Sequence, residues 1–216
     1  MLALSIALGC LFAFLLLLFG VSLWEKHPTD AYGPPLAGEF PQQRSYLVAA
    51  RVDATACGLI DMTIHRHNRF DVVIAMWFGP DRDFVVSAGQ GKIAGAATKQ
   101  TWIYSRLQTG EVLMTTDGFD EGDPSGLYIT QRVVKVRLAK LIAAHRKRLN
   151  AAMATVLPFD EMNAADAVRN IQRERAQRLI ERGRAYWIDD DENTWRFTIG
   201  GALRVCLGWL GQFWSG

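Results

Sequence analysis

The chain has few cysteines and no recognisable catalytic or cofactor motif. Cys10, Cys57 and Cys206 are too few and too scattered for a disulfide framework or a zinc site. A Cys57–Cys206 bridge remains possible for an extracytoplasmic domain, but buried free thiols are the expected state. No serine lies in a nucleophile-elbow context, and Cys57 has no obvious histidine partner. We therefore expect no cofactor, and the sequence names no catalytic residue.

The chain also has little net charge, +2, although that charge is unevenly distributed. From Arg132 to Arg184 there are thirteen Lys and Arg against five Asp and Glu. No aromatic residue is interleaved with the arginines from Arg169 to Arg184, so nucleic acid is not an expected partner. A basic region in a membrane-anchored chain instead favours the cytoplasmic side and is attracted to anionic lipid.

The glycine-rich segment Gly89-Gln90-Gly91-Lys92 falls short of the phosphate-binding motifs. A Walker loop requires glycine where Val86 stands and serine or threonine where Ile93 stands. A dinucleotide fingerprint requires glycine where Ala94 stands. The segment is therefore predicted to be a flexible hairpin or a wide loop between strands.

Two histidines form an incomplete metal-binding pattern. His65 and His67 share one face of a predicted strand, and Asp61 or Asp71 could join them. No third ligand stands at a recognisable spacing, and neighbouring arginines disfavour a divalent ion. The pair is better interpreted as the polar face of an edge strand.

An acidic loop has the composition of a calcium site without its spacing. It contains Asp117, Asp120, Glu121 and Asp123 among glycines. Phe119 stands where the second acidic ligand of an EF-hand belongs, and the twelfth position has no glutamate. A solvated turn is the expected structure, and no metal is predicted.

What the chain does have is an apolar run from Leu2 to Trp24 without a charged residue. A helix of this length covers roughly 34 Å, enough to cross a hydrocarbon core of about 30 Å. A cleaved signal peptide would be shorter and would begin with cations. We therefore predict a single-pass transmembrane anchor over residues 1–25 that contacts membrane lipid through residues 2–24.

A Pro/Gly-rich spacer is predicted over residues 26–41, where Pro34 and Pro35 are adjacent. The remaining residues, 42–216, are enough for one domain with its own core. We expect this domain to be α+β, with a β-rich part over 58–134 and a helical part over 136–214.

Six segments have strand patterns separated by turn residues. They are Leu59–Arg66, Asp71–Phe78, Asp83–Ala88, Thr101–Gln108, Glu111–Thr116 and Leu127–Val134. Their short connections allow hairpins rather than parallel crossovers, which predicts an antiparallel meander. The nearly continuous apolar residues of 72–78 indicate its central strand.

Four further segments have helical spacing. Gln42–Cys57 also alternates in places, and we interpret it as a helix. Val136–Ala151 carries an apolar stripe, and another helix is predicted to follow the N-cap Asn163 and end near Ala185. The last predicted helix, Thr194–Trp214, is rich in tryptophan and could pack in the core, lie at the membrane interface or cross the membrane.

These features predict a membrane-anchored accessory or interaction protein with its soluble domain on the cytoplasmic side. A protein partner or membrane complex would contact the arginine-rich helix and the tryptophan-rich C-terminal helix. The candidate contact residues are Arg173, Arg175, Arg178, Arg182, Trp209 and Trp214. The alternative is a membrane-tethered enzyme of unrecognised class, whose active-site residues are scattered in the sequence. The sequence identifies no small-molecule ligand.

Overall fold

The computed structural model describes residues 13, 16, 17, 19–29, 32, 33, 44–67, 71–93, 96–118, 123–134, 136–191 and 193–214. The chain divides into two compact units, which we describe separately. Unit 1 combines Met1–Thr29, Glu121–Gly126 and Glu174–Gly216, and unit 2 combines Asp30–Asp120 and Leu127–Arg173. The predicted α+β class is confirmed, and the single domain over 42–216 stays a prediction. Most of the predicted spacer lies outside the described residues.

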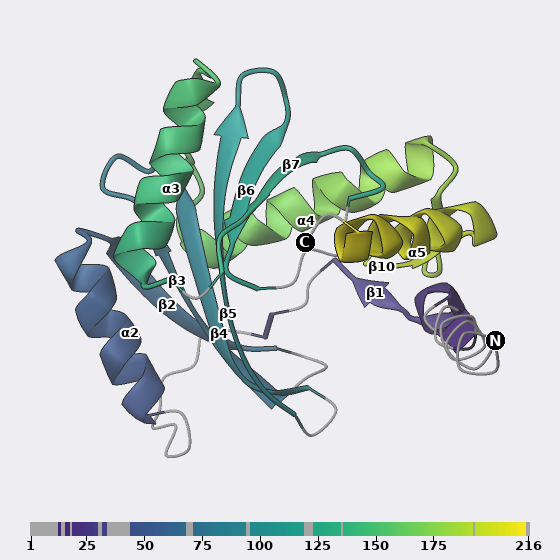
Figure 1. The fold of residues 1–216 in the computed structure, drawn as a ribbon, viewed down its shortest axis with the longest axis horizontal. Coiled ribbons are helices and arrows are strands. Elements are labelled where there is room, and N and C mark those ends of the chain that lie inside the picture. The colour runs from purple at the N-terminus through teal and green to yellow at the C-terminus, as the bar shows by residue number, and fades with distance from the viewer. Residues whose placement is uncertain are drawn as a thin grey trace. The chain divides into compact units, whose positions relative to one another are not determined.

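Unit 2 is built on a seven-stranded sheet (Figure 1). Its main strands lie in chain order: β2 (Ile60–Arg66), β3 (Asp71–Phe78), β4 (Val85–Ile93), β5 (Ala96–Leu107), β6 (Val112–Thr116) and β7 (Tyr128–Arg132). The short strand β8 (Val156–Leu157) pairs with β5. Neighbouring strands from β2 to β6 are antiparallel, as predicted.

Two sequence predictions about this sheet are wrong. Strand β7 runs parallel to β6, and its first residue pairs with the first residue of β6. The connection over 117–127 is longer than a hairpin turn, so it can return the chain to the end of the sheet at which β6 begins. The predicted glycine-rich loop is part of β4, where Gly89 faces the side chains of Val72 and Ile74. A Cβ at Gly89 would lie only 3.3 Å from Val72 Cγ1, so glycine allows close packing here rather than a loop.

Helices cover both faces of the sheet (Figure 1). On one face, α2 (Arg44–Ala56) and α3 (Leu138–Ala151) pack on Val73, Ala75 and Trp77. On the other, residues 164–173 of α4 (Ala164–Glu181) share a core with Val72, Ile74 and Met76. Strand β3 is therefore buried on both sides, which explains its continuous apolar sequence.

The helix boundaries follow capping signals. Asp166 N donates to Asn163 Oδ1 at 2.9 Å, which confirms Asn163 as the cap of α4. Helix α4 ends at Glu181, before the predicted Ala185, because Gly183 adopts a positive φ of 64° that terminates it.

Unit 1 contains a small antiparallel sheet in the order β1 (His27–Pro28), β10 (Thr194–Phe197) and β9 (Ala185–Trp187). Helix α5 (Ile199–Trp214) follows, so the predicted start of the last helix at Thr194 is wrong. Thr198 ends the strand and caps α5, accepting from Gly201 N at 3.2 Å. The unit 1 core joins this sheet to α5, to the end of α4 and to the helical residues 19–24.

Among the described residues, no helix is both long and apolar enough to span a membrane. Residues 1–12, 14, 15 and 18 of the predicted anchor lie outside the described part of the chain.

Candidate functional site

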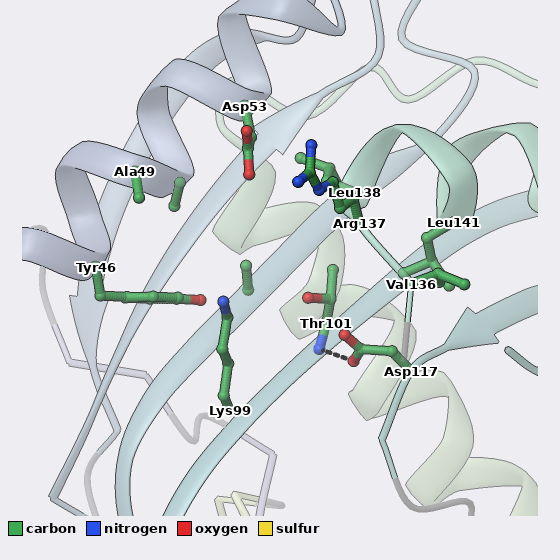
Figure 2. Close-up of a pocket in the computed structure, with 12 residues that line it drawn as sticks. Tyr46, Ala49, Asp53, Lys99, Thr101, Asp117, Val136, Arg137, Leu138 and Leu141 are labelled. Carbon is green, nitrogen blue, oxygen red and sulfur yellow. Dashed lines mark hydrogen bonds between the residues drawn. The ribbon is translucent and has the colours of Figure 1, made fainter. Parts of the chain in front are cut away.

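Unit 2 contains a pocket of about 290 Å³ between α2, the strands β4 and β5, and the start of α3 (Figure 2). Its floor is apolar and is formed by small and aliphatic side chains such as Ala50, Ala88 and Leu141. Six polar or charged side chains also line the pocket. They are Tyr46, Asp53, Lys99, Thr101, Asp117 and Arg137.

Tyr46 provides the most informative polar group in this pocket. Its side chain is only 8% exposed, and its hydroxyl has no hydrogen-bond partner among the described residues. Figure 2 shows this hydroxyl pointing toward the amine of Lys99, whose nitrogen lies 5.3 Å from the Tyr46 ring centroid. Burial, reinforced by the negative charge of Asp117, raises the pKa of Tyr46 above its ordinary value. The phenol therefore stays protonated and can donate a hydrogen bond.

Asp117 is held in place by the pairing of β5 with β6. Its Oδ1 accepts from Thr101 N at 2.6 Å, and its own N–H donates to Thr101 O. Asp53 and Arg137 project toward the same space from α2 and from the residue before α3 (Figure 2). The pocket thus brings together two cations, two carboxylates and one neutral donor, a set suited to binding.

The two histidines of the predicted strand make separate contacts. His65 is buried, and its Nδ1 lies 2.8 Å from the carbonyl oxygen of Gly33. His67 pairs with Tyr32, and the two ring centroids are 6.1 Å apart. In the described part of the chain no three His, Cys, Asp or Glu side chains gather as a metal site.

The two described carboxylates of the acidic loop have separate roles: Asp117 lines the pocket of unit 2, and Asp123 makes its contacts inside unit 1. Asp123 accepts from the Ser125 hydroxyl at 2.6 Å and pairs with Arg175, whose Nε lies 3.4 Å from Asp123 Oδ1. Both side chains of this ion pair are largely buried. Asp120 and Glu121 lie outside the described residues. Asp123 therefore serves as a counter-ion for an arginine of α4.

The predicted contact arginines fall into two groups. Arg175 pairs with Asp123, and Arg178 pairs with Glu174 at 2.9 Å. Arg173 and Arg182 are exposed. The side chains of Trp209 and Trp214 lie outside the described residues, so the predicted contact site is not tested as a whole. Cys57 and Cys206 are free thiols, as expected, but only Cys206 is buried.

Unit 2 contains a buried polar network that the sequence did not predict. His145 Nε2 lies 2.9 Å from Ser105 Oγ, and its Nδ1 lies 2.8 Å from Thr115 Oγ1. Ser105 donates its proton to Asp83 O at 2.7 Å, so it accepts from His145 and cannot be deprotonated by it. This is a structural network rather than a nucleophile and base. His145 falls on the apolar stripe of the predicted helix, four residues after Leu141, and that position was the available signal.

Unit 1 carries an unusual apolar surface. On α5, Ile199, Leu203 and Leu207 are 68%, 51% and 55% exposed, while Ala202 and Val205 on the opposite side are buried. In the N-terminal helical residues, Val21 and Trp24 are exposed while Phe19 and Leu23 pack on the unit 1 core. Helix α5 therefore combines core packing with an outward apolar stripe.

A shallow groove of about 550 Å³ lies beside this stripe. It is lined by residues that include Trp24, Tyr186, Arg196 and Ile199. The guanidinium carbon of Arg196 stands 5.9 Å from the Trp24 ring centroid. Aromatic and cationic side chains thus border the apolar stripe.

No protein-family model, curated protein or solved structure matches this chain. Inferences about its function must then come from the structure, which has two relevant features. One is the apolar surface of unit 1, and the other is the pocket of unit 2.

Proposed function

We propose that this chain is a membrane-anchored accessory protein whose unit 1 docks on lipid. The observation that carries the proposal is the division of α5 into two apolar faces. Ala202 and Val205 face the unit 1 core, and Ile199, Leu203 and Leu207 face outward with more than half of each side chain exposed. A helix that borders water normally carries polar residues on its outer face.

The bilayer is the occupant that best fits this surface. The outward side chains Val21 and Trp24 belong to the charge-free run Leu2–Trp24, whose composition suits a hydrocarbon environment. Trp24, Tyr186 and Arg196 border the groove beside α5. Such amphipathic aromatic and cationic side chains are typical of the headgroup level.

The partner-binding role belongs to the same proposal. Arg173 and Arg182 are the exposed members of the predicted arginine set, and they suit an acidic surface on a protein partner or membrane complex. Trp209 and Trp214 are proposed to contact the same partner or the lipid next to it. The basic region Arg132–Arg184 favours the cytoplasmic side for this domain.

Lipid docking is tested by spin-label depth measurement on the full chain in liposomes. Leu203→Cys and Leu207→Cys are labelled separately in a background without the native cysteines, with Lys147→Cys on α3 as the water-exposed control. We expect the labels at 203 and 207 to be accessible to oxygen and shielded from a water-soluble nickel chelate. Accessibility to the chelate equal to that at position 147 would rule out lipid docking of α5.

Anchoring itself is tested on native membranes. Washing with alkaline carbonate should leave the full chain in the membrane pellet, because inserted apolar segments resist this treatment. Recovery of the chain in the wash would contradict the anchor.

A further inference from the structure

We propose that the pocket between α2 and α3 binds a small aliphatic zwitterion of the free amino-acid class. This activity belongs to unit 2 and does not depend on lipid docking by unit 1. The proposal joins three properties of the pocket: its size, its balance of charges and its unpartnered phenol.

The size of the pocket suits a small molecule. Its volume of about 290 Å³ lies near the lower end for small-molecule sites in proteins. Ala50 and Ala88 keep the floor open, and Leu141 adds aliphatic surface. A short branched side chain fits this floor better than an aromatic or charged one.

The charges of the pocket favour a ligand that carries both signs. Lys99 and Arg137 supply two positive charges, and Asp53 and Asp117 supply two negative charges. A ligand with a single charge would meet two groups of opposite sign and two of its own sign. A zwitterion instead places its carboxylate near Lys99 and its ammonium near Asp117.

The Tyr46 hydroxyl supplies the orienting hydrogen bond. Buried polar groups in proteins nearly always have a partner, yet this hydroxyl has none among the described residues. It points into the pocket beside the Lys99 amine (Figure 2). Because the phenol stays protonated, it donates to an acceptor, and a ligand carboxylate between Tyr46 and Lys99 provides one.

Asp117 is positioned to accept a hydrogen bond from the ammonium group of the ligand. One of its oxygens is fixed by the backbone of Thr101, which orients the carboxylate at the pocket wall. An ammonium group is a strong donor to a carboxylate held in this way. The pocket therefore has a fixed acceptor and a fixed donor at separate points.

The first experiment measures binding of valine to the full chain in detergent by isothermal titration calorimetry. Isovalerate lacks the amine of valine, and isobutylamine lacks its carboxylate. We expect saturable valine binding, and binding at least about tenfold weaker for each analogue, which corresponds to loss of one charged contact. Absence of saturable heat with valine, or isovalerate binding as tightly as valine, would overturn the proposal.

Variants locate the binding in this pocket. Tyr46→Phe removes only the hydroxyl, and Lys99→Met removes the amine of an exposed side chain, so neither change requires repacking of the core. Each should weaken valine binding by about tenfold. Lys147→Met on α3 and Val52→Ala on the outer face of α2 are the matched controls and should bind valine like the unchanged chain. Unaltered binding by both Tyr46→Phe and Lys99→Met would place the site elsewhere and refute the proposal.

Discussion

His145 Nε2 and Ser105 Oγ lie 2.9 Å apart in the buried part of unit 2, with histidine as the donor. Thr115 Oγ1 donates to the other ring nitrogen at 2.8 Å. Because the Ser105 hydroxyl already donates to Asp83 O, the neutral imidazole carries its proton on Nε2 and accepts at Nδ1. Burial, with a smaller effect of the Arg146 charge, lowers the pKa of His145 from 6.5 to about 4.

This relationship predicts an acid-sensitive fold. The unfolded chain binds a proton at His145 below pH 6.5 and the folded chain only below about 4, so stability falls as pH drops between these values. The loss should reach about 3 kcal/mol at pH 4, because each pKa unit corresponds to about 1.4 kcal/mol. Urea unfolding at several pH values measures it. His145→Gln, which keeps a polar side chain without this titration, should lose less stability over the same range. Equal losses in both chains would contradict this account.

The Arg175–Asp123 pair predicts a large difference between two arginines of α4. Arg175→Met leaves the Asp123 carboxylate buried without its cation and should destabilise the fold by about 3 kcal/mol. Arg173→Met changes an exposed side chain and should alter stability by less than about 0.5 kcal/mol. Denaturant unfolding compares the two variants. Equal stability would show that the ion pair contributes nothing.

Of the four predicted contact arginines, only the two exposed ones, Arg173 and Arg182, are expected to contribute to partner binding. Arg173→Glu with Arg182→Glu should release a co-purifying partner without unfolding the chain, because neither residue belongs to the ion pairs that α4 makes within the described part of the chain. Quantitative mass spectrometry of the detergent-purified chain is the measurement. Lys147→Glu on α3 is the charge-matched control. Retention of the same proteins by both variants would remove these arginines from the partner site.

The orientation of the chain has its own test. Met162 is 89% exposed, so Met162→Cys in a background without native cysteines offers a thiol to a membrane-impermeant maleimide. We expect labelling in inverted vesicles and none in intact cells, because the basic region favours the cytoplasmic side. Labelling in intact cells would place unit 2 outside.

Adjacent glycines at the start of α5 should respond in opposite directions. A Cβ at Gly201 would lie 2.0 Å from Arg184 O, so Gly201→Ala must displace the helix or the strand beside it. A Cβ at Gly200 meets nothing within 4 Å, so Gly200→Ala should stabilise α5 by about 0.5–1 kcal/mol through helix propensity. Thermal unfolding distinguishes them. Two variants of equal stability would refute the close approach at Gly201.

Local patterns predicted the elements that depend on local causes. The predicted bounds of β3 were correct because a short, uninterrupted apolar segment between turn residues is typical of a buried strand. The cap at Asn163 was correct because N-capping depends only on neighbouring residues. The strand at Thr194–Phe197 was assigned to a helix because its aromatic residues suit either structure. Its pairing with β1, which is distant in sequence, and with the nearby β9 decided the outcome.

The candidate pocket was not predictable from the sequence. Tyr46, Lys99 and Asp117 carry no motif and are brought together by the pairing of β5 with β6 and by the packing of α2 on the sheet. The Arg175–Asp123 pair likewise joins residues that no local pattern connects. A single sequence does not encode such long-range contacts as spacing.

The connection between β6 and β7 has a consequence for the biosynthesis of this protein. It takes residues 121–126 from the middle of unit 2 into unit 1, whose remaining segments are the two ends of the chain. Unit 1 therefore stays incomplete until the ribosome has made residues 174–216. In the nascent chain, Asp123 has no ion-pair partner on α4 until Arg175 has been synthesised. During that interval the apolar N-terminal segment has no finished unit to join, so early delivery of the nascent chain to a membrane or a chaperone would protect it from aggregation.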